Sequence, residues 1–435
     1  MIKIKGHVQL KEESEIHYEE IIGQIARDAA YGTYQEFPES LAKKLIDFRD
    51  YVKVENAEPL EGQTNIFSFE ISISQKIFPI DEGGIQHFIS TAAGDLFEGD
   101  TPDKDIVKIE VDSIDWETMK SGASDNIKRI RSKFNLNGFE PLMAFTFKPR
   151  FGLEIDEFIK ISKQVLDTGF HIVEPDTRKI LQNSEKAKFI EFAKNVCNLT
   201  VGNHTKAFSL NLSNRNNDID EIVRELSEEN SSPVVFKIDG GLDGLTLMQK
   251  AKSVNPNCII TCYPLLKNQF KSKIPTEFLN EATIYCGADI MYPSGRANIH
   301  DTVRSYGSTD RHAVNNSARR YTKYIDSGSF IPTVAGGITP AQLHIFYELY
   351  GPNIAFFLGG AVALHQDGPE HGARLCMNII RHAVKYRQQH PTGEANDIPE
   401  TLMNEIHGKY ENMEYLSPSE FFKINSHING YFRKA

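Results

Sequence analysis

A lysine that follows an apolar run is the first residue whose type and place suggest chemistry. Lys148 begins the segment KPRFG (148–152), directly after the run LMAFTF (142–147). A lysine at the end of a buried strand needs a partner or a role, and its ammonium can lose a proton when desolvated and act as a base. A solvated loop lysine explains the segment equally well, so both interpretations stay open.

Two carboxylates follow the next apolar run. Glu174 and Asp176 lie in HIVEPD (171–176), and they share one face if the segment is a strand, because side chains repeat every two residues. Two neighbouring carboxylates can hold Mg²⁺ through oxygen ligands. The alternative is an ordinary ion pair with Arg178 or Lys179, and the residues alone do not decide between the two.

Two glycine pairs follow two later apolar runs. Gly336 and Gly337 come after IPTVA (331–335), and Gly359 and Gly360 come after IAFFL (354–358). Glycine lets exposed backbone N–H groups approach an anion near a following helix N-terminus. Paired placement at two strand ends therefore favours an anion site, such as a phosphate site, over ordinary turns.

A further cationic candidate, Arg296, lies in YPSGR (292–296). It stands at the start of a segment, 295–330, that is long for a strand-to-helix unit and can include a mobile loop that covers a site. Arg296 can clamp an anionic group, or it can be a solvated loop charge.

These residues stand near the ends of apolar runs, each followed by a segment with helical periodicity. Strands buried on both faces have this apolar composition. Eight such units predict a (β/α)₈ TIM barrel with function at the C-terminal strand ends, and a doubly wound open sheet is the alternative. The predicted strands are LMAFTFKP (142–149), HIVEPD (171–176), AFSLNLS (207–213), PVVFKIDGG (233–241), CIITCYP (258–264), ADIMYPS (288–294), IPTVAGG (331–337) and IAFFLGGAV (354–362).

The first third of the chain has a different pattern. A helical stretch over 19–30 is followed by strand patterns in NIFSFEISI (65–73) and IVKIEV (106–111). This mixture predicts an α+β domain of the ferredoxin-like kind. We therefore expect an N-terminal α+β domain over 1–140, the barrel over 141–388 and a C-terminal helical extension over 389–435.

Composition narrows the class of protein and its partners. The 435 residues carry a net charge of -11 and no long basic run, which argues against nucleic acid or an anionic membrane as partner. Five cysteines without CxxC spacing indicate reduced thiols, and Cys258 and Cys262 are expected as buried strand residues. No signal peptide or membrane span is expected, so the predicted location is cytoplasmic.

In this order, the segments resemble the RuBisCO superfamily, and the resemblance covers most of the chain. Its most specific parts are the KP-x-x-GL motif and the GG-to-GA segment, which places His365 on the family histidine. The matching segments are KPRFGL (148–153), TVAGGITPAQLHIFYELYG (333–351), FLGGAVALHQDGPEHGARL (357–375), YGTY (31–34) and GDLFE (94–98).

The resemblance implies roles for individual residues. Lys148 would be the lysine beside the enolised carbonyl, Asp95 falls where RuBisCO has a metal-proximal asparagine, and Asn211 fits the LN motif of strand three. Residues that would hold one phosphate or a similar anion are Thr33, Gly337, Gly359 and Gly360, with Gly336 beside them.

The departures from the family pattern are equally informative. RuBisCO has a DFTKDDE-type strand two, in which the carbamylated lysine, an Asp and a Glu bind Mg²⁺. Here Glu174 stands in the position of that lysine and Thr177 in that of the glutamate ligand, so only Asp176 is kept. Carbamylation is excluded at Glu174, although its own negative charge can replace that of the carbamate.

Two further motifs are replaced. Tyr263 lies in CYP (262–264), where the family has an HIHR-type motif, and Tyr292 lies in MYP (291–293), where it has HIHAG. The second phosphate therefore loses its arginine. The mobile-loop lysine that polarises CO₂ has no clear equivalent, Arg296 being the nearest candidate, so a bisphosphate carboxylase is not expected.

The resemblance thus implies a RuBisCO-like enzyme that abstracts a proton next to a carbonyl, as an isomerase, enolase or decarboxylase. Its substrate is expected to be a small keto-sugar or keto-acid with one anionic group. Mg²⁺ is the expected cofactor, with Glu174 and Asp176 as its ligands. The expected catalytic residues are Lys148, Glu174, Asp95 and Arg296.

Two rival interpretations remain. One is a non-catalytic member that binds a ligand or a protein partner. The other is a metal-free enzyme with His171 or Glu174 as its base, although His171 suits a core or outward-facing position better.

The resemblance also implies a homodimer in which Thr33 and Asp95 cap the barrel of the partner subunit.

Overall fold

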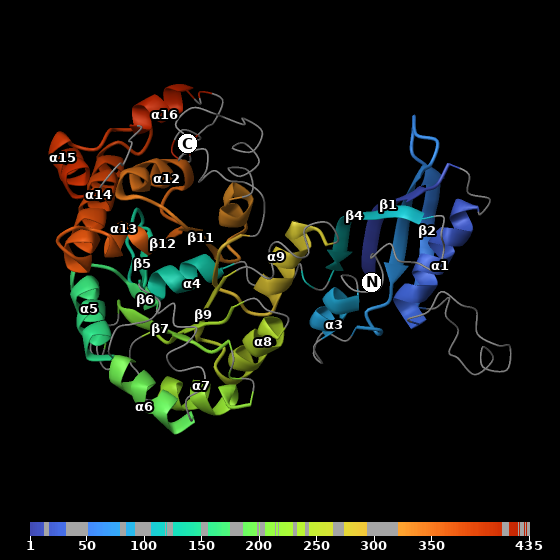
Figure 1. Cartoon of the computed structure of the whole chain (residues 1–435), viewed down its shortest axis with the longest axis horizontal. Coiled ribbons are helices and arrows are strands. Elements are labelled where there is room, and N and C mark those ends of the chain that lie inside the picture. The colour runs from blue at the N-terminus through green and yellow to red at the C-terminus, as the bar shows by residue number, and fades with distance from the viewer. Residues whose placement is uncertain are drawn as a thin grey trace. The chain divides into compact units, whose positions relative to one another are not determined.

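The computed structural model contains two compact units (Figure 1). One unit comprises Met1–Gly122, Gly240–Thr246 and Pro264–Cys286, and the other comprises Ala123–Asp239, Leu247–Tyr263 and Gly287–Ala435. The structure describes residues 1–12, 17–31, 51–78, 84–91, 106–117, 119, 125–148, 155–174, 186–197, 200, 205–213, 215, 217–228, 233–239, 243–263, 274–293, 321–410, 417–424, 426, 430 and 432.

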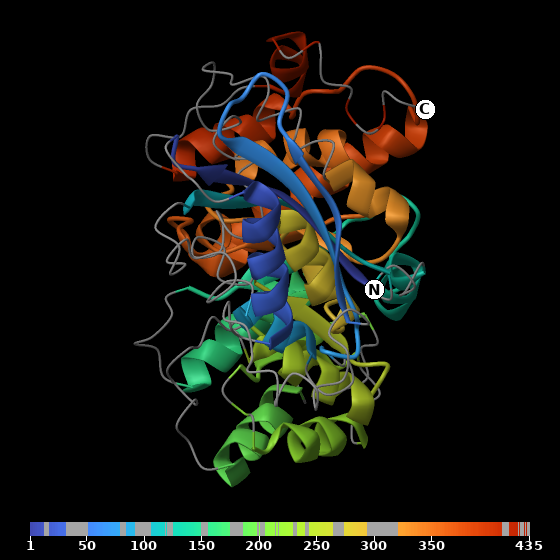
Figure 2. The ribbon, with the colours of Figure 1, turned by 90° about the vertical axis from the view of Figure 1, so that its right-hand side faces the viewer.

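The first unit is built on an antiparallel sheet. Every second residue of its first strand is buried, which is the period of a strand with one face on a core. Figure 2 shows its first helix lying across one face of the sheet. The elements are β1 (Ile2–Leu10), α1 (Tyr18–Tyr31), β2 (Val52–Pro59), β3 (Ile66–Ile73), α3 (Gly84–Thr91) and β4 (Ile106–Trp116), with the strand order β2-β3-β1-β4. This βαββαβ arrangement confirms the predicted ferredoxin-like domain.

A helix from much later in the chain completes this unit. The helix α9 (Thr276–Tyr285) packs through Phe278, whose ring is stacked with Trp116 at 6.4 Å between centroids. Phe88 meets both rings edge to face, at 5.6 Å from Trp116 and 5.5 Å from Phe278. Such aromatic clusters bury a large apolar area in a fixed geometry. The N-terminal unit is therefore discontinuous in sequence.

The second unit is a closed barrel of eight parallel strands, which confirms the predicted TIM barrel and excludes the open sheet. The strand order is continuous around the barrel, and helices line its outer face (Figure 1). Its strands are shorter than predicted. They are β5 (Leu142–Thr146), β6 (Ile172–Glu174), β7 (Ala207–Asn211), β8 (Val235–Lys237), β9 (Ile259–Cys262), β10 (Ile290–Met291), β11 (Ile331–Ala335) and β12 (Ala355–Leu358).

The helices that accompany the barrel follow the predicted alternation with strands. Thr339 caps a short 3₁₀ turn that begins at Pro340, and Gln342 Oε1 accepts the Thr339 N–H at 3.0 Å. The helices are α4 (Asn126–Lys133), α5 (Ile155–Asp167), α6 (Lys186–Cys197), α7 (Ile219–Glu228), α8 (Gly244–Val254), η6 (Pro340–Gln342), α12 (Leu343–Tyr350), α13 (Gly360–Ala363), α14 (Pro369–Gln389), α15 (Glu400–Lys409) and α16 (Pro418–Ile424).

The N-terminal end of the barrel is filled by apolar side chains. Ile130 and Phe134, on and directly after α4, pack against the first residues of the strands, among them Leu142 and Ile172. This packing closes one end of the barrel with hydrophobic contacts. The polar groups of the barrel interior therefore gather at the opposite, C-terminal end, where TIM barrels carry their active sites.

An ion pair ties two outer helices together. Glu348 on α12 accepts from Arg387 on α14, with Nε 3.0 Å from each carboxylate oxygen, and both side chains are buried. A planar guanidinium that binds a carboxylate in this way also fixes its geometry. The pair thereby links α12 to α14, which pack against each other.

All five cysteines are free thiols. Cys258 and Cys262 are buried in or beside β9, as expected. Burial raises the pKa of Cys258 to about 11 and that of Cys197 and Cys286 to about 12, and it raises the pKa of Cys376 as well.

In the part of the chain that the structure describes, no helix is long and apolar enough to cross a membrane.

His171 lies directly before β6, at the end of the strand opposite to Glu174. Its Nδ1 accepts the Met143 N–H at 3.0 Å, and its ring meets that of Phe134 edge to face at 6.2 Å. Burial, helped by the nearby Lys206 ammonium, lowers the pKa of His171 to about 4. The imidazole is therefore neutral at ordinary pH and belongs to the closed end of the barrel, which removes it as a candidate base.

We expect the titration of His171 to destabilise the protein in acid. Its pKa is about 4 in the folded chain against the ordinary histidine value of 6.5, so protonation favours the unfolded state as pH falls through this window. The loss is on the order of 3 kcal/mol. In His171→Gln, whose amide oxygen can accept the same N–H, the midpoint of thermal unfolding should fall less between about pH 7.5 and about pH 4.5 than in the parent. An equal fall in both proteins would contradict the lowered pKa.

Candidate active site

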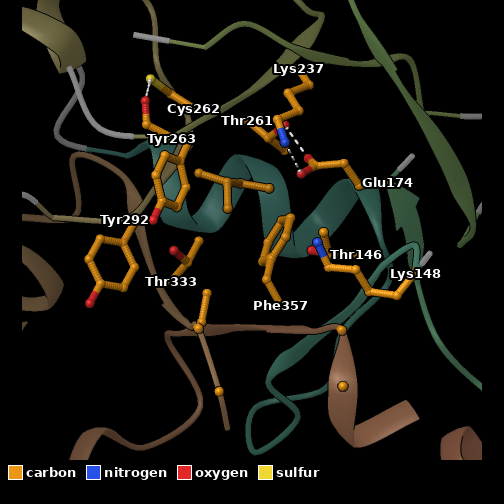
Figure 3. A pocket seen from close by; sticks show the side chains of 16 residues that line it. Thr146, Lys148, Glu174, Lys237, Thr261, Cys262, Tyr263, Tyr292, Thr333 and Phe357 are labelled. Atoms are coloured by element: carbon orange, nitrogen blue, oxygen red, sulfur yellow. Dashed lines mark hydrogen bonds and ion pairs between the residues drawn. The ribbon is translucent and has the colours of Figure 1, made fainter. Parts of the chain in front are cut away.

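A cavity of about 220 Å³ opens at the C-terminal ends of the barrel strands. Figure 3 shows that its side chains converge from several strands of the barrel. Basic, acidic, aromatic and glycine residues share this one space, which makes it the default binding site of the unit. The lining residues are Thr146, Lys148, Glu174, Lys237, Thr261, Cys262, Tyr263, Ile290, Tyr292, Thr333, Ala335, Gly336, Gly337, Phe357, Gly359 and Gly360.

A buried ion pair lies at the floor of the cavity. Oε1 of Glu174, the last residue of β6, is 3.0 Å from Nζ of Lys237, the last residue of β8, and their side chains are 5% and 8% exposed. Oδ1 of Asp239 is 3.9 Å from the same ammonium. A charge so far from solvent requires a partner. Here each member of the pair compensates the other (Figure 3).

Hydroxyl groups hold the second oxygen of this carboxylate. Oε2 of Glu174 accepts from Thr261 Oγ1 at 2.7 Å and from Ser209 Oγ at 3.4 Å, and both donors are buried. Thr146 and Thr333 line the same cavity. The alternate strands β5, β7, β9 and β11 thus each carry a hydroxyl residue, as expected from the layers that side chains form inside a TIM barrel. The direction of the Glu174 carboxylate is therefore fixed.

Lys148 extends into the cavity from the loop after β5 and lies against the loop after β12. A Cβ atom placed on Gly359 would be 3.4 Å from both Cγ and Cε of Lys148 and 3.3 Å from the backbone oxygen of Thr146. At 3.3 Å the Thr146 carbonyl would have to move by a few tenths of an ångström, and at 3.4 Å the added atom would touch the Lys148 side chain. Because residue 359 is glycine, the Lys148 side chain has space beside it. The flexible amine of Lys148 therefore lies next to the loop that contains Gly359.

The two glycine pairs border the cavity as predicted. Gly336 and Gly337, after β11, have φ values of +82° and +67°, in the left-handed region that glycine adopts without strain. Gly359 precedes α13 and Gly360 is its first residue. All four line the cavity and have no side chains, so their backbone is open to a ligand, as a backbone anion site requires.

Two tyrosines form another side of the cavity. Tyr263 follows β9 and Tyr292 follows β10, and their rings are stacked with centroids 6.1 Å apart and planes 24° apart. They lie at the positions where the RuBisCO family has its HIHR-type and HIHAG motifs, which this chain lacks. This side therefore offers aromatic faces and phenol groups to a ligand, in place of the cationic groups of those motifs.

The described residues do not fit a Mg²⁺ site. Within the described ranges, no group of three or more His, Cys, Asp and Glu side chains is placed to hold a metal. Glu174, one of the predicted ligands, already has the Lys237 ammonium 3.0 Å from Oε1. A divalent ion about 4 Å from an ammonium would be repelled by about 8 kcal/mol at an effective dielectric constant of about 20. Among the described residues, the side chains that line the cavity are the groups available for its chemistry.

The structure brings part of the predicted site together. Lys148, Glu174 and the four glycines all line the cavity. The remaining predicted site residues lie outside the described residues, and their roles stay predictions: Thr33, Asp95, Asp176 and Arg296. The alternative ion-pair partners of Glu174, Arg178 and Lys179, also lie outside them.

Lys237 is the functional candidate that sequence reasoning missed. It lies in the predicted strand PVVFKIDGG (233–241), which was recognised only as an apolar run. A single lysine inside such a run is a usable signal, because lysine is almost never fully buried without a partner. The partner, Glu174, is on another strand and becomes visible only when the barrel closes.

The contact between Gly359 and Lys148 predicts the effect of one added methyl group. In Gly359→Ala, the Cβ would press on Lys148 and on the Thr146 carbonyl, so we expect binding of inorganic phosphate to weaken about tenfold, as for about 1.4 kcal/mol. Gly138→Ala is the matched control, because no atom lies within 4 Å of a Cβ at that position. Isothermal titration of both variants makes the comparison. Unchanged phosphate affinity in Gly359→Ala would place the anion elsewhere.

Comparison with known proteins gives matches to ribulose bisphosphate carboxylases. No protein-family model matches the chain. The ribulose bisphosphate carboxylase of Pyrococcus furiosus is 21% identical over 391 residues, which are 84% of this chain and 86% of that protein. The ribulose bisphosphate carboxylase of Pyrococcus horikoshii is 21% identical over 386 residues, which are 84% of each chain.

Solved structures give the same result for the fold. The octameric RuBisCO from Pyrococcus horikoshii, in complex with sulfate ion, matches with a TM-score of 0.66 at 18% identity, over 90% of this chain and 91% of that one. The dimeric archaeal RuBisCO from Hyperthermus butylicus matches with a TM-score of 0.62 at 18% identity, over 89% and 90% of the two chains. These likenesses show a shared fold.

Proposed function

We propose, on the premise that the chain is a divergent member of the RuBisCO superfamily, that it is an enzyme that removes a proton from the carbon next to a carbonyl. The reaction would be an isomerisation, an enolisation or a decarboxylation. The substrate is a small keto-sugar or keto-acid that carries one anionic group, such as a phosphate.

The observation that carries this proposal is that Lys148 lies beside Gly359 in the cavity, so close that a Cβ on Gly359 would be 3.4 Å from its side chain. An anion bound by the glycine loops would lie beside the lysine, so the carbonyl end of the same small molecule stays within its reach. Lys148 accepts the α-proton, and the loops hold the substrate in place. Positioning a base and a substrate in this way is a main source of rate enhancement.

The tyrosine side of the cavity favours one anionic group over two. Tyr263 and Tyr292 line that side, and aromatic faces do not neutralise a phosphate. A substrate with a single anion at the glycine loops and an uncharged end against the tyrosines suits the cavity better than a bisphosphate. We therefore propose an activity other than bisphosphate carboxylation.

Replacement of Lys148 tests the proposed base. Lys148→Ala should lower the exchange of α-protons with solvent deuterium by about 10²- to 10⁴-fold, because a general base contributes about this much. Proton NMR of keto-sugars and keto-acids, phosphorylated and unphosphorylated, measures the exchange. Lys163→Ala, which removes a lysine paired with Asp167 on the outer helix α5, is the control and should exchange like the parent.

Two results would contradict the proposal in different ways. Exchange that survives in Lys148→Ala would remove this lysine from the mechanism. Phosphate binding at the glycine loops without exchange on any substrate of the panel would instead indicate a ligand-binding member of the superfamily.

We also propose that the protein forms homodimers with shared active sites. The relatives named above include a dimeric and an octameric RuBisCO. The resemblance assigns Thr33 and Asp95 to the site of the neighbouring subunit, where they would cover the barrel mouth and exclude water from an enolate. A two-fold interface would supply both covers at once.

A mixed dimer tests the shared site. Lys148→Ala subunits and Asp95→Ala subunits should each be inactive alone. After subunit exchange, hybrids should regain up to about half of the parent activity, because one of their two composite sites is intact. Mass spectrometry verifies that exchange has occurred. Exchange without recovered activity would place each site within a single chain.

A further inference from the structure

We infer that Lys237 is a catalytic residue, whose ammonium binds the carbonyl oxygen of the substrate and supplies the positive charge that would otherwise come from a divalent cation. The inference deepens the proposed function and rests on it for the identity of the reaction. It assigns the stabilisation of the enolate to a side chain of this chain, held in place by Glu174.

The position of Lys237 carries the inference. Its side chain is 8% exposed, and the exposed part faces the cavity that also receives Lys148. Figure 3 shows the ammonium of Lys237 beside the Glu174 carboxylate, among the side chains that line the cavity. A cation at the floor of a small cavity acts on a ligand oxygen through little intervening water, where electrostatic stabilisation is strongest.

The environment of Glu174 explains why this ammonium can be kept there. Glu174 Oε1 compensates the charge at 3.0 Å, while Thr261 and Ser209 hold Oε2 and fix the direction of the carboxylate. The cation is thus preorganised before a substrate arrives, as a transition-state stabiliser has to be. Glu174 acts as a positioning residue, since both of its oxygens already accept from donors.

The chemical step balances without a further reactant. The bond from the α-carbon to hydrogen breaks, and its proton passes to the lone pair of Lys148, which takes part as the neutral amine and becomes an ammonium. The electron pair of that bond forms the carbon–carbon double bond of the enolate, and the negative charge moves to the carbonyl oxygen. Lys237 keeps its proton and donates a hydrogen bond to this oxygen. Return of a proton to carbon closes the cycle.

Lys237 and a divalent cation would each stabilise the enolate oxygen by positive charge, and they exclude each other. Both would have to occupy space at the same carboxylate oxygen, and their like charges repel. The inference therefore requires that an enolate-like anion binds tightly when no metal is present. Oxalate, a planar dianion that resembles an enediolate, is a suitable probe.

The experiment is isothermal titration of oxalate into the full-length protein in buffer with EDTA. The parent should bind oxalate, and Lys237→Met should bind it about 10- to 100-fold more weakly, because a hydrogen bond to a charged group is lost. Lys206→Met is the matched control, since Lys206 pairs with Asp167 outside the cavity, and its affinity should equal that of the parent.

A second variant guards against a folding defect. Lys237→Met leaves Glu174 buried without its cation, which destabilises a protein strongly, whereas replacing both members of a buried pair by apolar residues is often tolerated. Glu174→Met combined with Lys237→Met should therefore unfold at a higher temperature than Lys237→Met alone. It should still bind oxalate as weakly as that single variant. Oxalate affinity equal to the parent in this double variant would overturn the inference.

Metal binding provides the opposing outcome. Electron paramagnetic resonance of Mn²⁺ should show no tight site in the parent, and added Mn²⁺ should not strengthen oxalate binding. A stoichiometric Mn²⁺ site on which oxalate binding depends would overturn the inference, as would failure of the parent to bind oxalate at all. Exchange of α-protons that requires Mg²⁺ would sink the inference and spare the proposed function. Metal-free oxalate binding through Lys237 without any exchange would do the reverse.

Discussion

A carboxylate enclosed in a barrel has to be neutralised where it lies, and the arrangement of the cavity follows from this constraint. Glu174 is 4% exposed, so its counter-charge comes from Lys237 on a strand two places around the barrel. The strand between them supplies Ser209, and the next supplies Thr261, which together orient the carboxylate. Four neighbouring strands thus contribute to the polar cluster around Glu174, and apolar side chains fill the other end of the barrel.

Around this centre, the cavity has two sides with different physical origins. The glycine side is a property of the backbone, since Gly336 and Gly337 adopt conformations that other residues avoid and Gly359 makes room for Lys148. The tyrosine side is a property of side chains alone. A ligand in the cavity would therefore meet backbone at the glycine loops and aromatic surface at the tyrosines, and both lysines line the same space.

The sequence predicted the parts of this arrangement that depend on local pattern. Eight apolar runs were sufficient for the barrel, and the glycine pairs were found because they follow two of those runs. Lys237 was not found, because its role depends on which strand lies two places away in a closed sheet. The same limit applied to Glu174, for which sequence neighbours were considered as partners while the structure pairs it across the barrel.

The discontinuous make-up of the N-terminal unit has a consequence for biosynthesis. Its aromatic cluster needs Phe278, which is translated long after Phe88 and Trp116 and after most of the barrel strands. The unit consequently cannot reach its final packing on the ribosome until α9 has emerged. A fragment that ends before this helix would present the Trp116 ring to solvent or to chaperones. The two units, though compact, are thus interleaved along the chain and mature together.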